Sequence, residues 1–153
     1  MANYENQVSW SNLVAFVNGK LKELYPTIKR YGNDDVDGAT PPYFFVECVP
    51  YRLTHSTKNM QHKNCSMKIT YVQKTPNQID SIRKADEICS LIGMVVDVNE
   101  RKLLVKDFTY EFIGEDNNIL QISYTHDWWE STQEEESGEL VETVHTSIKR
   151  KEE

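Results

Sequence analysis

One stretch decides the fold: in Cys65-Ser66-Met67-Lys68-Ile69-Thr70-Tyr71, apolar and polar side chains alternate at every position. A period of two is typical of a β-strand that buries one of its faces. The pattern returns at 107–112 and 120–125, and residues 114–118 between them (Gly-Glu-Asp-Asn-Asn) have turn chemistry. We therefore predict that the last two segments pair as an antiparallel hairpin.

Further strands are predicted before this stretch. Residues 43–49 are a run of β-formers, and residues 27–31 are a candidate for a short additional strand. Between the first run and the alternating stretch, residues 50–63 are polar and contain no acidic residue. We interpret residues 50–63 as a long hairpin arm or loop.

Two helices are predicted from apolar side chains at helical spacing. The first runs from about Asn6 to Tyr25 and is stopped by Pro26. Its apolar stripe consists of Trp10, Leu13, Val14, Val17, Leu21 and Leu24.

The second helix is predicted to end near Ile92, where Gly93 is a plausible stop. At its start we expect Thr75 to cap, Pro76 to take the first helical position and Gln78 to complete a capping box. The face expected to be buried consists of Ile79, Ile82, Ala85, Cys89 and Ile92.

These elements predict an α+β fold, with an antiparallel sheet of four to five strands and two helices packed on one face. We expect a single domain over residues 1–130. Residues 131–153 form an acidic C-terminal extension, which we expect to order only on assembly. The alternative is that these residues are a frayed terminus.

Length and charge exclude several classes of protein. The chain has 153 residues, a formal net charge of −7 and no apolar run long enough to cross a membrane, and its N-terminus does not look like a secretory signal. A net negative charge disfavours a nucleic-acid-binding factor, which needs a basic face. The charge is uneven, because residues 130–153 carry a net charge of −5 and residues 1–129 only −2.

No catalytic or cofactor signature is found, so we expect no enzyme activity, no cofactor and no metal site. The best metal candidate is the array His55, His62 and Cys65. However, Cys65 is in phase with the buried face of its strand. The simpler interpretation of His55 and His62 is that they are exposed loop residues without a metal. Cys48 and Cys89 are in phase with apolar faces as well.

The candidate functional residues are interface residues. Trp128 and Trp129 are adjacent on a predicted strand, so one should enter the core and the other should lie on the outer face or rim. The alternative is that both pack beneath the acidic extension. The remaining candidates are polar or charged: Arg52, His55, Lys58, His62 and Lys63 in the arm, and Glu134, Glu135 and Glu136 in the extension.

Several strings resemble a known family. The chain has Pro42-Tyr43-Phe44-Phe45-Val46-Glu47 after its first helix and an acidic loop, and then Met67-Lys68-Ile69-Thr70-Tyr71-Val72. A helix with Pro76 at its start and two strands that end in aromatic residues follow. Over about residues 6–129, this order is similar to that of the tail terminator (tail completion) proteins of Gram-positive phages and of phage-like contractile particles.

The resemblance implies a structural protein that forms a ring, generally sixfold, at the head-proximal end of the tail tube. Such a ring stops tube polymerisation and offers a surface to the neck, and in contractile particles also to the sheath. The implied partners are further copies of the chain, the tail tube protein, and sheath and neck or connector proteins. The implied location is the tail of a virion or a bacteriocin-like particle (tailocin), after synthesis in the bacterial cytoplasm.

Two alternatives stay open at this point: another neck or connector protein, or a small cytosolic ligand-binding module. Within the ring hypothesis, we expect the basic arm to meet the acidic end at 130–142 across subunits, or to dock onto the tube. Replacing Arg52, Lys58 and Lys63 with glutamate should then abolish attachment while leaving the monomer folded.

Overall fold

The computed structural model describes residues 7–32 and 38–132 and confirms the predicted α+β fold class. Strand β1 forms at the site of the predicted short strand, and the arm at 50–63 is the outer part of one long hairpin. The elements, in chain order, are α1 (Trp10–Leu24), β1 (Lys29–Tyr31), β2 (Tyr43–Thr57), β3 (Met60–Val72), α2 (Gln78–Ile92), β4 (Val95–Val98), β5 (Arg101–Leu104), β6 (Lys106–Ile113) and β7 (Ile119–Ser131).

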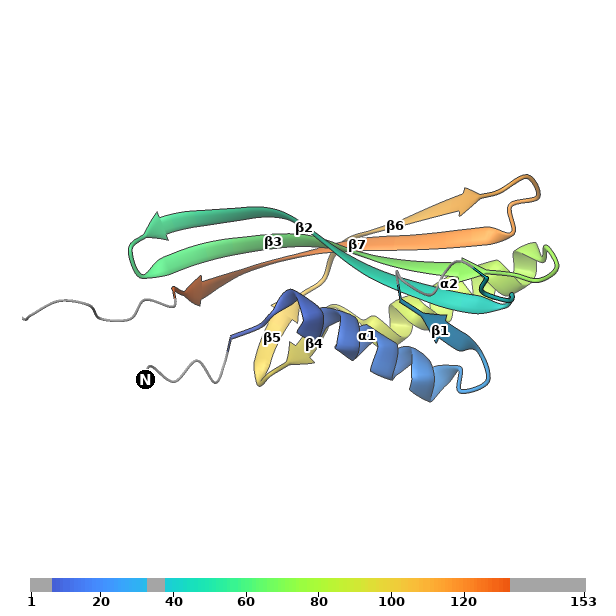
Figure 1. The fold of residues 1–153 in the computed structure, drawn as a ribbon, viewed down its shortest axis with the longest axis horizontal. Coiled ribbons are helices and arrows are strands. Elements are labelled where there is room, and N and C mark those ends of the chain that lie inside the picture. The colour runs from blue at the N-terminus through green and yellow to red at the C-terminus, as the bar shows by residue number, and fades with distance from the viewer. Residues whose placement is uncertain (1–6, 33–37, 133–153) are drawn as a thin grey trace, which may run out of the picture.

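The main sheet has five strands in the order β1-β2-β3-β7-β6. Strand β3 is central and pairs antiparallel with both neighbours, with β7 along its entire length from Met60 to Val72. Only the short pair β1–β2 is parallel, so the sheet is mixed rather than fully antiparallel. The long strands twist as they run across the molecule (Figure 1).

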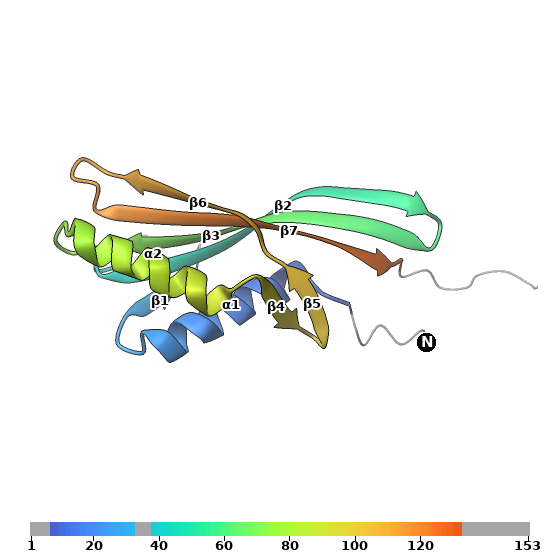
Figure 2. The ribbon, with the colours of Figure 1, turned by 180° about the vertical axis from the view of Figure 1, so that it is seen from behind.

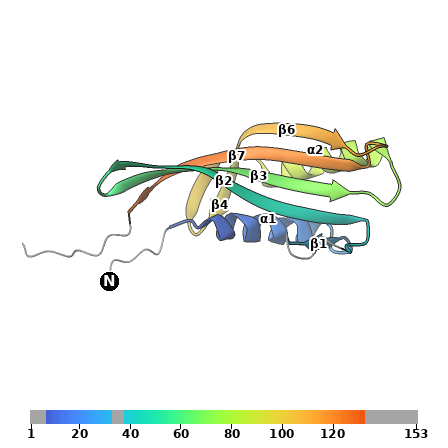
Figure 3. The same ribbon diagram turned by 45° about the horizontal axis from the view of Figure 1, so that its top comes forward.

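Both helices cover the same face of this sheet, as predicted (Figures 1 and 2). Their apolar stripes pack on the inward side chains of β2, β3 and β7 and form one core. The helical layer does not extend under the outer part of the β2–β3 hairpin, which continues beyond it (Figure 3). The core side chains with the least exposure include Leu13, Leu21, Phe44, Met67, Ile69, Ile88, Leu120, Ile122 and Tyr124.

Helix α1 begins later than the sequence predicts, because its cap lies at Ser9 rather than near Asn6. The Ser9 side chain accepts a hydrogen bond from the backbone N–H of Asn12, and the Asn12 side chain accepts one from the Ser9 backbone. This reciprocal pair satisfies backbone donors that would otherwise have no partner.

Helix α2 corrects two predictions. Its cap is Asn77, whose side chain accepts from the Asp80 backbone N–H, so Thr75 and Pro76 lie before the helix. The buried stripe is Ser81, Ala85, Ile88 and Ile92, whereas the predicted Ile79 and Ile82 are exposed. Gly93, with a φ of 69°, ends the helix as predicted.

The β4–β5 hairpin was not predicted. Its two-residue turn places Asn99 and Glu100 at positive φ, the geometry that joins two antiparallel strands tightly. Val96, Val98 and Leu103 bury one side of it in the core. Among the described residues, no helix is long and apolar enough to cross a membrane.

Candidate functional site

The arm, residues 50–63, is the outer part of the β2–β3 hairpin. Its strands pair through His55 and Gln61, and the turn lies between Thr57 and Met60. The end of β7 adds a third strand, since Ser131 lies opposite Met60. The arm therefore projects as a three-stranded ribbon beyond the helices (Figure 1).

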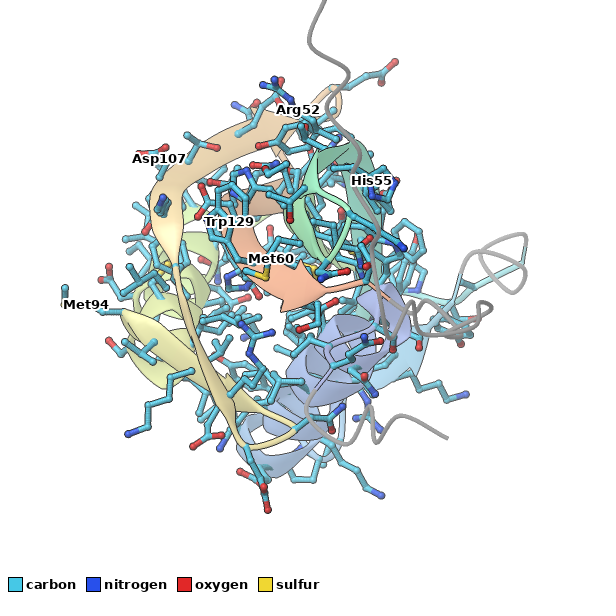
Figure 4. The ribbon with its side chains drawn as sticks, turned by 90° about the vertical axis from the view of Figure 1, so that its left-hand side faces the viewer. Arg52, His55, Met60, Met94, Asp107 and Trp129 are labelled. Carbon is cyan, nitrogen blue, oxygen red and sulfur yellow. The ribbon has the colours of Figure 1, made fainter. Side chains whose placement is uncertain are left out.

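The arm exposes both charged and apolar side chains. Arg52, His55 and Lys58 are exposed, as are Tyr51 and Leu53 between and beside them. Viewed from the tip, Arg52 and His55 lie at the periphery of the ribbon (Figure 4). Large apolar side chains that are flanked by charges and left in water are a common property of protein interfaces.

A second group occupies the face of the ribbon that points away from the helices. His62 stacks on Trp129 with ring centroids 4.4 Å apart and an interplanar angle of 10°. Asp127 lies 3.8 Å from His62 Nε2, and it accepts two hydrogen bonds of 3.1 Å from Lys106 Nζ. Trp129 is exposed, which agrees with one tryptophan facing outward.

Trp128 lies on the opposite face and is only 4% exposed. Its ring meets that of Trp10 edge to face at 5.2 Å. Trp128 thus offers almost no surface to a partner. Of these two tryptophans, only Trp129 is exposed and available for an interface.

The inner face at the base of the arm holds a buried ionic cluster, which we call the arm-base cluster: Lys63, Arg101 and Glu130. The Glu130 side chain has no exposed area, and its oxygens lie 3.0 Å from Lys63 Nζ and 3.5 Å from Arg101 Nη1. It also accepts a 2.5 Å hydrogen bond from the Val8 backbone N–H. The cluster ties β3, β5, β7 and the N-terminal segment together.

Lys63 is consequently a structural residue. Its ammonium lies over the rings of Trp10 and Trp128, at 5.2 and 5.9 Å, as well as against Glu130. Glutamate at position 63 would place a second carboxylate beside a fully buried one. We therefore expect the triple glutamate substitution at Arg52, Lys58 and Lys63 to destabilise the monomer, contrary to the sequence-based prediction. Arg52 and Lys58 stay as candidate interface residues.

Sequence reasoning missed Glu130 and Arg101. A signal was present, because the even-numbered positions from Leu120 to Glu130 all face inward. Extending the alternation from 120–125 would have placed Glu130 in the core. No comparable pattern marks Arg101, which reaches Glu130 from the hairpin that was not predicted.

An open groove of about 760 Å³ runs between the arm and the N-terminal segment. Trp10 and Leu53 give it apolar walls, and Lys58 and Lys63 give it positive charge beside His55. Such a lining suits an acidic or amphipathic protein segment better than a small neutral ligand. The other lining residues are Gln7, Thr57, Gln61 and Thr132.

A second polar group, the α2 cluster, lies at the opposite end of the sheet and consists of Tyr71, Gln73, Asp80 and Lys84. Asp80 accepts hydrogen bonds from Tyr71 Oη (2.9 Å), Gln73 Nε2 (3.0 Å) and Lys84 Nζ (2.9 Å). Burial alone would raise the pKa of this carboxyl, but the three donors and the lysine charge outweigh it and lower the pKa. The cluster fixes the start of α2 against β3.

The remaining predicted residues are separated from one another. His62 and Cys65 lie at positions of β3 that face opposite sides of the sheet, and His55 is exposed at the tip. Within residues 7–32 and 38–132, no group of three histidine, cysteine, aspartate or glutamate side chains could hold a metal ion. Glu134, Glu135 and Glu136 lie outside the described residues, so their predicted interface role stays a prediction.

His126 is a buried histidine that the interface does not use. Its ring is 1% exposed, and Nδ1 lies 2.7 Å from the Leu104 carbonyl oxygen. Burial lowers the pKa of this imidazole despite that hydrogen bond and the nearby Asp127, so a neutral ring is favoured. His126 is therefore a structural residue of the core.

Comparison with known proteins gives one informative result. Residues 12–138 match a family described as phage tail terminator protein. No curated protein shows significant similarity to the chain.

One solved protein chain, which carries only an identifier as its name, aligns with 85% of this chain and 100% of its own length. The two are 11% identical and have a TM-score of 0.43. That likeness is too weak to establish a common fold, so the family match is the comparison on which the function rests.

Proposed function

The chain belongs to the phage tail terminator protein family, with a structural role in the phage tail, and from that premise we propose that it caps the head-proximal end of the tail tube as a ring. In this proposal six copies close the ring, stop polymerisation of the tube and present a surface to the neck. The role is structural rather than enzymatic.

The observation that supports ring formation is the arm. A closed ring of identical copies needs two different patches per copy, one meeting the other on the next copy. The arm projects beyond the helical layer (Figure 3) and carries exposed apolar side chains. An element that leaves its own core in this way is suited to reach a neighbouring copy.

The proposed partners are the tail tube protein below the ring and neck or connector proteins above it, with the last sheath ring added in a contractile particle. The chain would be made in the bacterial cytoplasm and incorporated into the particle there. The net charge of −7 would let DNA pass through the lumen without adhering, if the particle carries DNA.

Electron microscopy of particles tests this proposal directly. A tagged chain, labelled with gold, should appear once per tail, at the end opposite the baseplate. Light scattering on the purified protein should give a mass six times that of one chain. Label along the whole tail, or none on any particle, would contradict the terminator role, and label inside the neck would favour a connector.

A further inference from the structure

The exposed large apolar residues of the described chain gather in two regions. One group lies at the arm: Tyr51, Leu53, Met60 and Trp129. The other lies on α2, on β6 and at the β4–β5 hairpin: Ile79, Ile82, Met94, Val95, Leu104, Tyr110, Phe112 and Ile113. Leu24 stands apart from both.

We call the outer part of the second group the α2–β6 face and define it as Ile79, Ile82, Tyr110 and Phe112. Helix and strand are in contact there, because Cys89 Sγ on α2 lies 2.9 Å from Tyr110 Oη on β6. A recess near Phe112 is lined by Pro76, which precedes α2, and by Gln78, the first residue of α2. The face is therefore a continuous side of the molecule.

Strand β6 is also an edge of the sheet. It pairs with β7 on one side, and no described strand pairs with its other side. Soluble proteins usually protect an exposed edge with charges or prolines, and a long apolar edge is a site where another chain adds. Phe112 and Ile113 give this edge an apolar character at the end far from the arm (Figure 1).

The two regions carry opposite charge. Residues 50–63 contain Arg52, Lys58 and Lys63 and no acidic residue. Residues 107–118, from β6 and the turn after it, contain no lysine or arginine, and the carboxylates Glu111, Glu115 and Asp116 are exposed there. Opposite charge next to exposed apolar area on both sides is the arrangement expected of two complementary patches.

The arm and the α2–β6 face lie at opposite ends of the molecule, so they cannot meet within one chain (Figures 1 and 2). We propose that the arm of one copy docks on the α2–β6 face of the next copy, with Tyr51 and Leu53 against the apolar side chains and Arg52 and Lys58 facing Glu111 and Glu115. This inference rests on the proposed ring and identifies its repeating contact. Because the two patches differ, the contact is head to tail and propagates around a ring.

Charge reversal on the full-length chain tests the contact. The arm variant Arg52→Glu/Lys58→Glu and the face variant Glu111→Lys/Glu115→Lys should each raise the concentration needed for half-assembly at least about tenfold. Combining all four substitutions should restore assembly, because the attraction is re-created with its signs exchanged. The control Lys22→Glu/Lys29→Glu changes the same charge at exposed positions on α1 and β1 and should assemble normally.

A photo-reactive amino acid in place of Leu53 locates the partner surface. In a mixture of ¹⁵N-labelled and unlabelled chains, we expect cross-links between copies that map to residues 79–82 or 110–116. Cross-links to residues 133–153 would overturn this inference in favour of docking by the acidic extension.

The two proposals can fail separately. Rings that form equally well with the arm or face variant would overturn the contact and leave the ring intact. A wild-type chain that stays monomeric, both alone and with tail tubes, would overturn the ring and this contact together. Circular dichroism of each variant must match the wild type for the comparison to count.

Discussion

The arm-base cluster and the α2 cluster are both lysine–carboxylate groups that hold an element in place, but they differ in depth. Glu130 has no exposed side-chain area, whereas Asp80 keeps 29% of its side chain exposed. A buried carboxylate depends on its protein partners because water cannot replace them, while an exposed one recovers part of its solvation when a partner is lost. The base of the arm should therefore tolerate substitution far less than the start of α2.

The largest expected effect comes from breaking the arm-base cluster. Lys63→Met should lower the free energy of unfolding by about 3–5 kcal/mol, because it leaves a buried carboxylate poorly compensated. Urea denaturation followed by circular dichroism measures this. The double variant Lys63→Met/Glu130→Leu should recover much of the loss, and a single-variant cost below about 1 kcal/mol would mean that Glu130 is hydrated in solution.

The next test concerns which side of α2 packs on the sheet. Ile88→Ala should cost about 2–5 kcal/mol because Ile88 is fully buried, whereas Ile82→Ala should stay within about 0.5 kcal/mol. The same denaturation experiment compares them. Equal costs would show that α2 is rotated relative to this structure.

A smaller effect is expected at the start of α2. Asn77→Ala should cost about 1 kcal/mol, since it removes the acceptor of the Asp80 backbone N–H. Thr75→Ala is the matched control and should be nearly neutral. A larger cost at Thr75 would support the cap that the sequence suggested.

The smallest effect is a dependence on pH. The pKa of Asp80 is lowered in the folded chain, so the unfolded chain binds a proton more readily. The stabilisation from ionised Asp80 is thus present above its ordinary pKa of 3.8 and is lost as the pH falls through the lowered value. Asp80→Asn should flatten stability against pH in this acid range. Asp86→Asn, at an exposed position on α2, is the matched control for the removal of one carboxylate.

Much of the fold was predictable because period and turn chemistry are local properties. The strands around Ile69 and Ile122 and the stop at Gly93 follow from neighbouring residues alone. The start of α2 was misplaced because both Thr75 and Asn77 have side chains that could cap a helix. Asn77 prevails because its backbone N–H and C=O both bond to the Gln73 side chain, at 3.0 and 2.8 Å.

The candidate site was predictable only in part. The sequence places Arg52, His55 and Lys58 on a polar arm, and the structure exposes them there. It could not separate Lys63 from these residues, since its partners Trp128 and Glu130 lie 65 and 67 positions further along the chain. The sequence shows that Lys63 is charged and needs a polar partner. Only the packing around Lys63 decides whether that partner is water or Glu130.

By itself, the sequence determined the number and type of most elements, the α+β class and the position of the basic arm, because each depends on spacing within one segment. Only the tertiary structure decided which side of α2 is buried, which tryptophan faces water and which lysine is structural. Those outcomes depend on contacts between distant segments. A helix with two possible apolar stripes has no preferred one until β3 and α1 are packed against it.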